Sequence, residues 1–290
     1  MLSRRCDTTA VEEPQEVRAG VLAYARVQVT PDQVATLRKQ PGPWHGEPLP
    51  PTALKYSDEQ TLTGLAALLH AMDRFQLSRA EFADWGILAC PRFIGRGGIA
   101  PTMEKYKTGG AASVQPNVIP HRCLHAISGT LSQILKMRGP NLGIGGGPLQ
   151  DRELLQTTAA FLASGQAPGF WLVFTGYDPE YIPEGPGVPM SSWVCHGLAL
   201  ALTASPNQSA WQLRIAAPPS VCVTPKLDEA PELLLHRVAE MMQVMTEDAR
   251  DASVTWQMPL GPRLTLAHVD ADTAKETILA FPQQTYRVAV

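Results

Sequence analysis

The sequence lacks the features that mark several large protein classes. Its 24 Lys and Arg residues against 27 Asp and Glu give a net charge of -3, and no basic run indicates a nucleic-acid surface. No apolar run reaches the roughly 18 residues that cross a bilayer. The N-terminal stretch MLSRRCDTTAVEEPQE has no apolar core of the signal-peptide kind. We therefore expect a cytoplasmic protein that binds neither nucleic acid nor membrane.

Metal and disulfide patterns are missing as well. The five cysteines are Cys6, Cys90, Cys123, Cys195 and Cys222. They include no CxxC pair, so neither a disulfide framework nor a zinc site is indicated. The one HxxxH pair, His121 and His125, has no adjacent glutamate and no evident third ligand. The sequence predicts reduced thiols, no bound metal and no cofactor.

The composition that is present suits a folded core. Hydrophobic residues make up 44% of the 290 positions and charged residues 18%, enough for one large domain or two small ones. We expect a flexible lead-in over residues 1–17, a main domain over 18–218, and a divergent α+β segment over 219–290 packed on the same core.

Apolar strands alternate with helical stripes, which predicts an α/β sheet with parallel strands in its core. The expected strands are 20–29, 84–90, 141–144, 170–177 and 263–269. Two further apolar runs, SWVCHGLALALTA and WQLRIAA, are expected to pair as a hairpin around SPNQS.

Helices are expected at five places: after Ser57, over 120–138, over 149–164, near 229–246 and over 272–281. Ser57 and Gln60 have the spacing of a capping box. The stripe of the first helix is Leu62, Leu65, Leu69 and Met72. The stretch 91–119 reads as loop-rich because GRGG and TGG interrupt it.

The stretch GPNLGIGGGPLQD (139–151) has four glycines within five positions, between a short strand and a helix. A dinucleotide fingerprint would need a glycine at Pro148 and an acidic residue further on. A phosphate-binding P-loop would need GK[ST]. A nucleophile elbow would need a reactive side chain, and none stands between Gly143 and Gln150. A turn whose glycines serve only packing remains the alternative.

Four stretches, in this order, resemble the N-terminal half of a β-ketoacyl synthase of the thiolase fold. They are LKYSDEQTLTGLAALLHAMDRFQLSRAEFADWGILACPRFIGRGG, VQPNVIPHRCLHAISGTLSQILKMRGPNLGI, GPNLGIGGGP and LLQTTAAFLASGQAPGFWLVFTGYDPE. The resemblance covers residues 52–205. It implies a thiolase-like, ketosynthase-type layered α/β sheet with a truncated or divergent C-terminal half.

Within that resemblance, GPNLGIGGGP lies over the family pattern GP-x-x-S-I-x-T-A-C. The nucleophilic cysteine of the family then falls on Pro148, its Thr-Ala on Gly146 and Gly147, and its serine on Gly143. Proline has no nucleophilic side chain and no N–H to hold an oxyanion. The resemblance thus predicts that no acyl-enzyme forms here, and that Gly143, Gly145, Gly146, Gly147 and Pro148 line a site for an acyl chain.

Two other residues are candidates for chemistry. LAHVDADTAKETI resembles the first histidine motif of the family and would place that histidine at His268, although the Gly-Thr expected after it is absent. Cys123, between His121 and His125, would start the 120–138 helix, where the helix dipole lowers a thiol pKa. For both residues the alternative is a structural side chain without chemistry.

The 120–138 helix carries small residues on one face, Ala126, Gly129 and Ser132. They suit either a close neighbour at the twofold interface that the resemblance implies, or packing within the chain.

The resemblance favours a non-catalytic, chain-length-factor-like partner subunit in fatty-acid or polyketide-type biosynthesis. Such a subunit forms a homo- or heterodimer with a ketosynthase-like chain and meets an acyl carrier protein or acyl thioester. One alternative is an enzyme with altered acyl-thioester chemistry, a decarboxylase or hydrolase. Another is an acyl-binding scaffold protein.

Overall fold

The computed structural model describes the chain between residues 16 and 278 with gaps. The described ranges are 16–44, 46–94, 96–116, 120–145, 150–178, 193–217, 234–243, 245, 253–258, 261–268 and 277–278. Gly146, Gly147 and Pro148 lie outside them, as do Cys6, Cys222 and nearly all of the expected lead-in.

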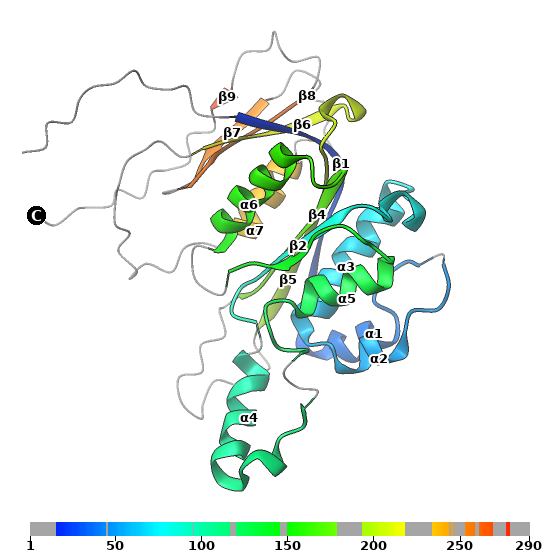
Figure 1. Ribbon diagram of the computed structural model, residues 1–290, viewed down its shortest axis with the longest axis vertical. Helices are drawn as coiled ribbons and strands as arrows, with labels where there is room; N and C mark the ends of the chain where they lie inside the picture. The colour runs from blue at the N-terminus through cyan, green and yellow to red at the C-terminus, as the bar shows by residue number, and fades with distance from the viewer. Residues whose placement is uncertain are drawn as a thin grey trace, which may run out of the picture.

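The described strands form one nine-stranded sheet in the order β3-β2-β4-β5-β1-β6-β8-β7-β9 (Figure 1). The strands are β1 (Glu16–Val29), β2 (Gly86–Pro91), β3 (Asn141–Gly143), β4 (Gly169–Asp178), β5 (Val194–Thr203), β6 (Trp211–Ala216), β7 (Ser253–Gln257), β8 (Arg263–His268) and β9 (Thr277–Ile278). β2 runs parallel to both β3 and β4, and β9 runs parallel to β7, whereas the other neighbours are antiparallel. The predicted α/β fold is confirmed, with a mixed sheet. The helix expected over 272–281 is wrong at its described residues, because Thr277–Ile278 pair with β7 as β9.

Helices cover both faces of the sheet (Figure 1). They are α1 (Val34–Lys39), α2 (Pro51–Tyr56), α3 (Glu59–Arg74), α4 (Arg96–Gly109), α5 (Ala126–Leu135), α6 (Gln150–Ser164) and α7 (Leu234–Gln243). Helices α6 and α7 pack in one hydrophobic core, and α3 and α5 pack in the other. Among the described residues, none of the helices combines the length and apolarity needed to cross a membrane.

Strand β4 shows how the sequence separates the two cores. Phe170, Leu172 and Phe174 point into the core that holds α6, and Trp171 and Val173 point into the core that holds α3. Side chains alternate between the faces of a strand, so a continuous apolar run is needed where helices cover both faces.

The apolar stripe expected for α3 is buried: Leu62, Leu65, Leu69 and Met72. The N-cap of this helix lies one residue after the predicted cap, Ser57. Ser57 donates its hydroxyl to the carbonyl of Ala53, and the side chain of Asp58 accepts the N–H of Thr61 at 2.7 Å. Asp58 is therefore the N-cap.

The predicted 120–138 helix is shorter in the structure. Residues 120–125 form turns, and α5 spans only Ala126–Leu135. His125 takes the N-cap position, and Lys136 ends the helix in a left-handed conformation with φ 55°. The apolar spacing in the sequence extends beyond α5, because Leu124 in the preceding turns also packs against the core. This made the predicted helix too long.

The predicted hairpin between β5 and β6 is wrong, because β1 lies between these two strands. Gly20 of β1 is paired with Thr203 of β5 and with Gln212 of β6. The connection over residues 204–210 crosses β1 there, and Ser209 donates its hydroxyl to the carbonyl of Val21 at 2.5 Å. A Cβ on Gly20 would lie 2.8 Å from Thr203, so the crossing requires glycine.

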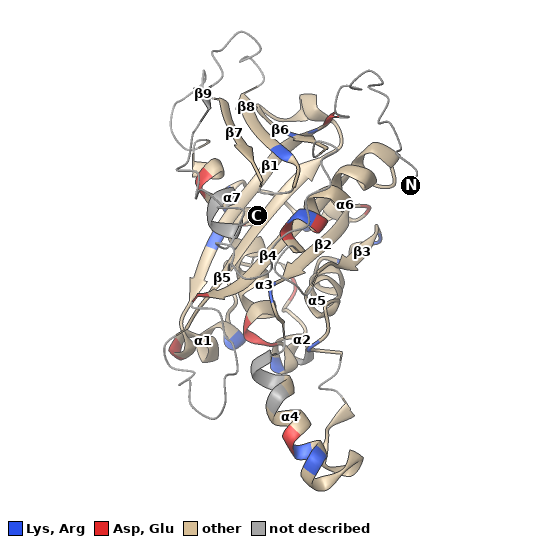
Figure 2. Ribbon diagram, turned by 90° about the vertical axis from the view of Figure 1, so that its left-hand side faces the viewer, with Lys and Arg blue, Asp and Glu red and all other residues tan. Residues whose placement is uncertain are grey.

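The stretch 91–119, expected to be loop-rich, contains the 14-residue helix α4. Pro101 lies inside this helix. Glycine and proline weaken a helix, yet the run from Thr102 to Thr108 that follows carries residues compatible with one. Figures 1 and 2 both show α4 projecting from the body of the molecule, away from the sheet.

Burial of α6 in its core should be a major source of stability. Leu154 of α6 is 0% exposed, whereas Gln156 on the same helix faces solvent. We expect Leu154→Ala to lower the free energy of unfolding by about 2–5 kcal/mol, through lost burial and the cavity left behind. Gln156→Ala should change it by less than about 0.5 kcal/mol. Urea denaturation followed by tryptophan fluorescence measures both, and equal losses would contradict the packing of α6.

Candidate functional site

The glycine-rich stretch connects the end of β3 to the start of α6. Gly143 is the last residue of β3, and Ile144 donates its N–H to the carbonyl of Ala89 at 2.8 Å. A Cβ on Gly143 would lie 1.9 Å from the carbonyl oxygen of Leu124. The backbone of the 120–125 segment therefore packs directly on the strand end.

Gly145 makes the second tight contact of this elbow. Its φ is +98°, a conformation that favours glycine. A Cβ there would lie 2.1 Å from the Cβ of Gln150, the buried first residue of α6. Packing and backbone geometry thus account for the glycines at 143 and 145, whatever else they do. The acyl-binding role of Gly143, Gly145, Gly146, Gly147 and Pro148 stays a prediction.

The first turn of α6 is tied to β2 and to the C-terminal part of the chain. The thiol of Cys90 on β2 donates to Asp151 Oδ1 at 3.1 Å. On the other side, a Cβ on Gly261 would lie 2.4 Å from Cδ of Arg152, so the backbone just before β8 packs on this arginine. Burial lowers the pKa of Arg152, and the nearby Glu153 partly offsets this effect.

Cys90 lies close to the elbow, but its environment suppresses reactivity. The side chain is fully buried, and burial raises the thiol pKa well above its usual value. The charge of Asp151 and its hydrogen bond raise the pKa further. A nucleophilic cysteine needs the opposite setting, namely exposure and a depressed pKa. Cys90 therefore does not have the environment of a nucleophilic cysteine.

The sequence candidates for chemistry are not brought together at the elbow. His268 is the last residue of β8, whereas the end of β8 near Arg152 is its first residue, Arg263. Five residues of strand separate them by about 16 Å. The ring of His268 instead packs edge-on against Trp211, with ring centroids 5.4 Å apart. Its catalytic role stays a prediction.

Cys123 lies in the turns before α5 and not in the first turn of a helix. The position at a helix N-terminus that was expected for this thiol is therefore not observed. The side chain is exposed, and Sγ approaches the carbonyl of Pro120 at 3.4 Å. Its neighbours in sequence diverge: His121 stacks on Tyr56, and His125 lies at the N-cap of α5. Within the described residues, no group of His, Cys, Asp and Glu side chains has an arrangement that would hold a metal.

Two of the three small residues of α5 pack within the chain. Ala126 and Ser132 are buried against the chain itself, and Ser132 accepts a hydrogen bond from the side-chain amide of Asn141 on β3 at 2.7 Å. A Cβ on Gly129 would meet only the ring of His125 at 3.2 Å. Of the two interpretations of this face, the structure favours core packing.

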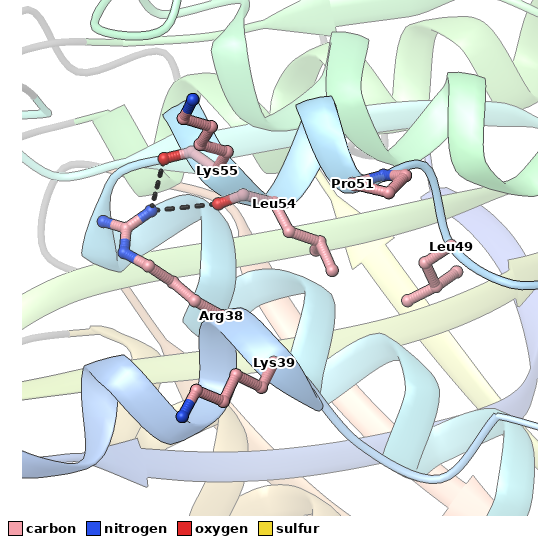
Figure 3. Close-up of a pocket in the computed structure, with 6 residues that line it drawn as sticks. All are labelled: Arg38, Lys39, Leu49, Pro51, Leu54 and Lys55. Carbon is pink, nitrogen blue, oxygen red and sulfur yellow. Dashed lines mark hydrogen bonds between the residues drawn. The ribbon is translucent and has the colours of Figure 1, made fainter.

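A surface cavity of about 390 Å³ lies between α1 and α2 (Figure 3). It is lined by Arg38, Lys39, Leu49, Pro51, Leu54 and Lys55. Arg38 donates to the carbonyls of Leu54, Lys55 and Ser57, and the two lysine ammonium groups point away from each other. Leu49 and Leu54 pack on the α3 side of the sheet.

Sequence comparison finds no relative: no protein-family model matches, and no curated protein is significantly similar. Solved structures do resemble the fold. A chain of the complex of the ketosynthase ApeO with its chain length factor ApeC from Xenorhabdus doucetiae matches with a TM-score of 0.52 and 9% identity. The match covers 87% of this chain and 100% of that one.

A second match is a chain of AntDE:AntF, a type II polyketide synthase acyl-carrier protein in complex with its ketosynthase bound to the hexaketide. It has a TM-score of 0.50 and 12% identity and covers 69% of this chain and 68% of that one. Identities this low show the fold alone. The chain has the thiolase-like fold of ketosynthases and chain length factors, as its sequence motifs indicated.

The contacts of Cys90 with Asp151 and of Gly261 with Arg152 were not predicted. Each joins residues from distant parts of the sequence, and neither pair belongs to a spacing motif. Asp151 lies in the first turn of α6, where an acidic residue is common because it interacts favourably with the helix dipole. Its presence there therefore did not indicate a contact with Cys90.

Native-state alkylation separates the cysteines. We expect Cys123 to react with iodoacetamide at pH 8, and Cys90 and Cys195 to be protected, because both are buried and burial raises both thiol pKa values. Peptide mapping by mass spectrometry gives the extent of labelling at each site, with urea-unfolded protein as the reference. Labelling of native Cys90 as fast as Cys123 would show an open, reactive thiol beside the elbow.

The elbow itself can be tested with two glycine substitutions. Gly143→Ala should destabilise the fold by about 1–3 kcal/mol or more, because its Cβ overlaps the backbone at Leu124. Gly129→Ala, inside α5 and against the exposed His125, should be neutral or stabilise by up to about 1 kcal/mol. Urea midpoints measure the difference, and similar effects of the two changes would contradict the tight packing at the elbow.

Proposed function

We propose that the chain is a non-catalytic, chain-length-factor-like subunit that pairs with a ketosynthase in fatty-acid or polyketide-type biosynthesis. The observation that carries the proposal is Pro148, on which the nucleophile position falls when GPNLGIGGGP is aligned with the motif of the ketosynthases that the chain resembles. Proline offers neither an attacking atom nor a backbone N–H to stabilise an oxyanion. Of the described thiols in this region, Cys90 is buried and bonded to Asp151, and Cys123 is exposed in the 120–125 segment that packs on Gly143.

The open edge of the sheet supports a partner. Strand β3 is the terminal strand on its side, pairing only with β2 among the described strands. Leu142 at its centre is 39% exposed. An uncovered edge with an exposed apolar side chain is a surface on which another chain adds readily. In the proposed pair, the ketosynthase covers this edge.

Helix α4 supplies a second contact surface for the same partner. Ile99, Met103 and Tyr106 are 40%, 50% and 51% exposed, and their spacing places them on one side of the helix. Single exposed apolar residues are common, but three on one face of a projecting helix mark an interaction surface. Isolated helices of this length are marginal in water, so a partner that covers the stripe would also stabilise α4.

In this proposal the carrier protein delivers the acyl chain to the pair, and the partner supplies the cysteine chemistry. The elbow contributes the shape of a ketosynthase site without its reactivity. The complexes among the matched structures, ketosynthase with chain length factor and ketosynthase with carrier protein, are consistent with such an assembly.

The experiment combines binding with turnover. The purified chain is incubated with acyl- and malonyl-loaded carrier protein, and intact masses of both proteins are followed; no acyl adduct, hydrolysis or decarboxylation is expected. Co-expression with a ketosynthase from the same source should give a complex. Turnover by the chain alone would favour the altered thioester enzyme. Acyl binding by a stable monomer that ignores every such ketosynthase would favour the scaffold alternative.

The two surfaces can be tested separately. Leu142→Asp and Met103→Glu each place a charge where the partner should bury an apolar side chain, so each should weaken ketosynthase binding about tenfold or more. The control Asn207→Asp adds a charge at an exposed site elsewhere. Calorimetric titration gives the affinities, and thermal unfolding checks that the variants are folded. Unchanged affinity in either variant removes that surface from the interface.

A further inference from the structure

The α4 excursion, residues 96–116, leaves the body after β2 and returns at residues 120–125. Its departing segment is held by two backbone contacts. Arg92 donates its N–H to the carbonyl of Thr175 at 2.8 Å, and its own carbonyl accepts the side-chain amide of Gln60 at 2.9 Å. The next residue, Phe93, has a φ of 51°. A large side chain in this left-handed region persists only where the surroundings enforce it.

Gln60 is a fully buried amide in the first turn of α3. Its oxygen accepts the hydroxyl of Thr175 at 2.7 Å, while its nitrogen reaches the carbonyl of Arg92. A buried polar side chain is tolerated where its hydrogen bonds are made. Gln60 thus joins the first turn of α3, strand β4 and the departing segment.

The returning segment is held by the residues just before Gln60. Arg122 Nη1 lies 3.7 Å from Asp58 Oδ2 and 3.7 Å from Glu59 Oε2. The Asp58 side chain is 1% exposed, and its other oxygen caps α3. Arg122 is the cation that faces this buried carboxylate. Ion pairs of this kind are costly to break from one side, since the remaining charge stays buried.

From this arrangement we propose that the first turn of α3, Asp58–Gln60, is a positioning device that sets the direction in which α4 projects. Three consecutive side chains hold both ends of the excursion to one point of the rigid core. Among the described elements, α4 packs against the short turn of Ala111–Ser113 that follows it, and the returning segment is also held by the stacking of His121 on Tyr56 and the packing of Leu124 on Gly143. If the chain pairs with a ketosynthase as proposed above, this device presents the face of Ile99, Met103 and Tyr106 to that partner in a fixed orientation.

A distance measurement tests the device without any partner. Spin labels are placed at Tyr106→Cys on α4 and Gln156→Cys on α6, in a background where Cys6, Cys123 and Cys222 are serine. Pulsed dipolar spectroscopy then reports how narrowly the arm is held. We expect one narrow distribution for this background.

Arg122→Gln in that background should broaden the distribution. The matched control is Arg138→Gln, which removes the ion pair of Arg138 with Asp84, both largely exposed, and should leave the distribution narrow. If Arg122→Gln does not fold, Glu59→Gln, which keeps the buried cap, should broaden the distribution to a smaller extent. Equal distributions in the folded Arg122 or Glu59 variant and in the control overturn the proposal.

Binding of the label-free variants separates this proposal from the proposed function. Arg122→Gln should weaken ketosynthase binding about fivefold or more, and Arg138→Gln should not. A broadened arm with unchanged affinity overturns the link between arm direction and the partner. If the unaltered chain binds no ketosynthase, the proposed function fails, while the distance measurement still decides whether Asp58–Gln60 holds the arm.

Discussion

The burial of α6 between parts of the sheet is the constraint on which the rest of the structure depends. The helix packs against β1, β2, β4 and β6, so strands from both ends of the sequence share one core with it. Its start must lie close to the ends of β2 and β3, because β3 leads into it through only six residues. That closeness forces the tight contacts of Gly143 and Gly145. It also places Asp151 against Cys90 and Arg152 against the backbone before β8.

On the other face of the sheet, polar side chains in the first turn of α3 join neighbouring segments in a similar way. Asp58 caps the helix and faces Arg122, and Gln60 bonds both Thr175 and the carbonyl of Arg92. Desolvation raises the pKa of Asp58, with Thr61 and Arg122 acting in the opposite direction. Gln60 is tolerated in the buried first turn because it bonds the carbonyl of Arg92, just past the end of β2, and the side-chain hydroxyl of Thr175 on β4.

The sequence predicted those elements whose signals are local. The apolar run of β4, the stripe of α3 and the short strand β3 all stand where periodicity placed them, and the family motifs indicated the thiolase-like fold. It failed where a distant segment intervenes: β1 separates β5 from β6, although the pattern of a hairpin is intact. It failed again at α4, where Pro101 and the glycines around it concealed a helix. At the candidate site, the family motif was enough to predict that the nucleophile position falls on Pro148. The Cys90–Asp151 contact could not be predicted, because it joins residues that only the folded sheet brings together.

The glycine elbow shows why a turn that resembles a catalytic turn is weak support for chemistry. Gly143 is needed because Leu124 touches its backbone, and Gly145 because Gln150 lies against it in a left-handed turn. These demands come from packing, so they hold whether or not the elbow carries a nucleophile. A chain without reactive groups at the elbow can still use the fold through its surfaces. Leu142 on the edge strand and the apolar face of α4 are both left exposed by the described part of the chain. Both lie where a second chain can bind, and both support the proposed assembly with a ketosynthase.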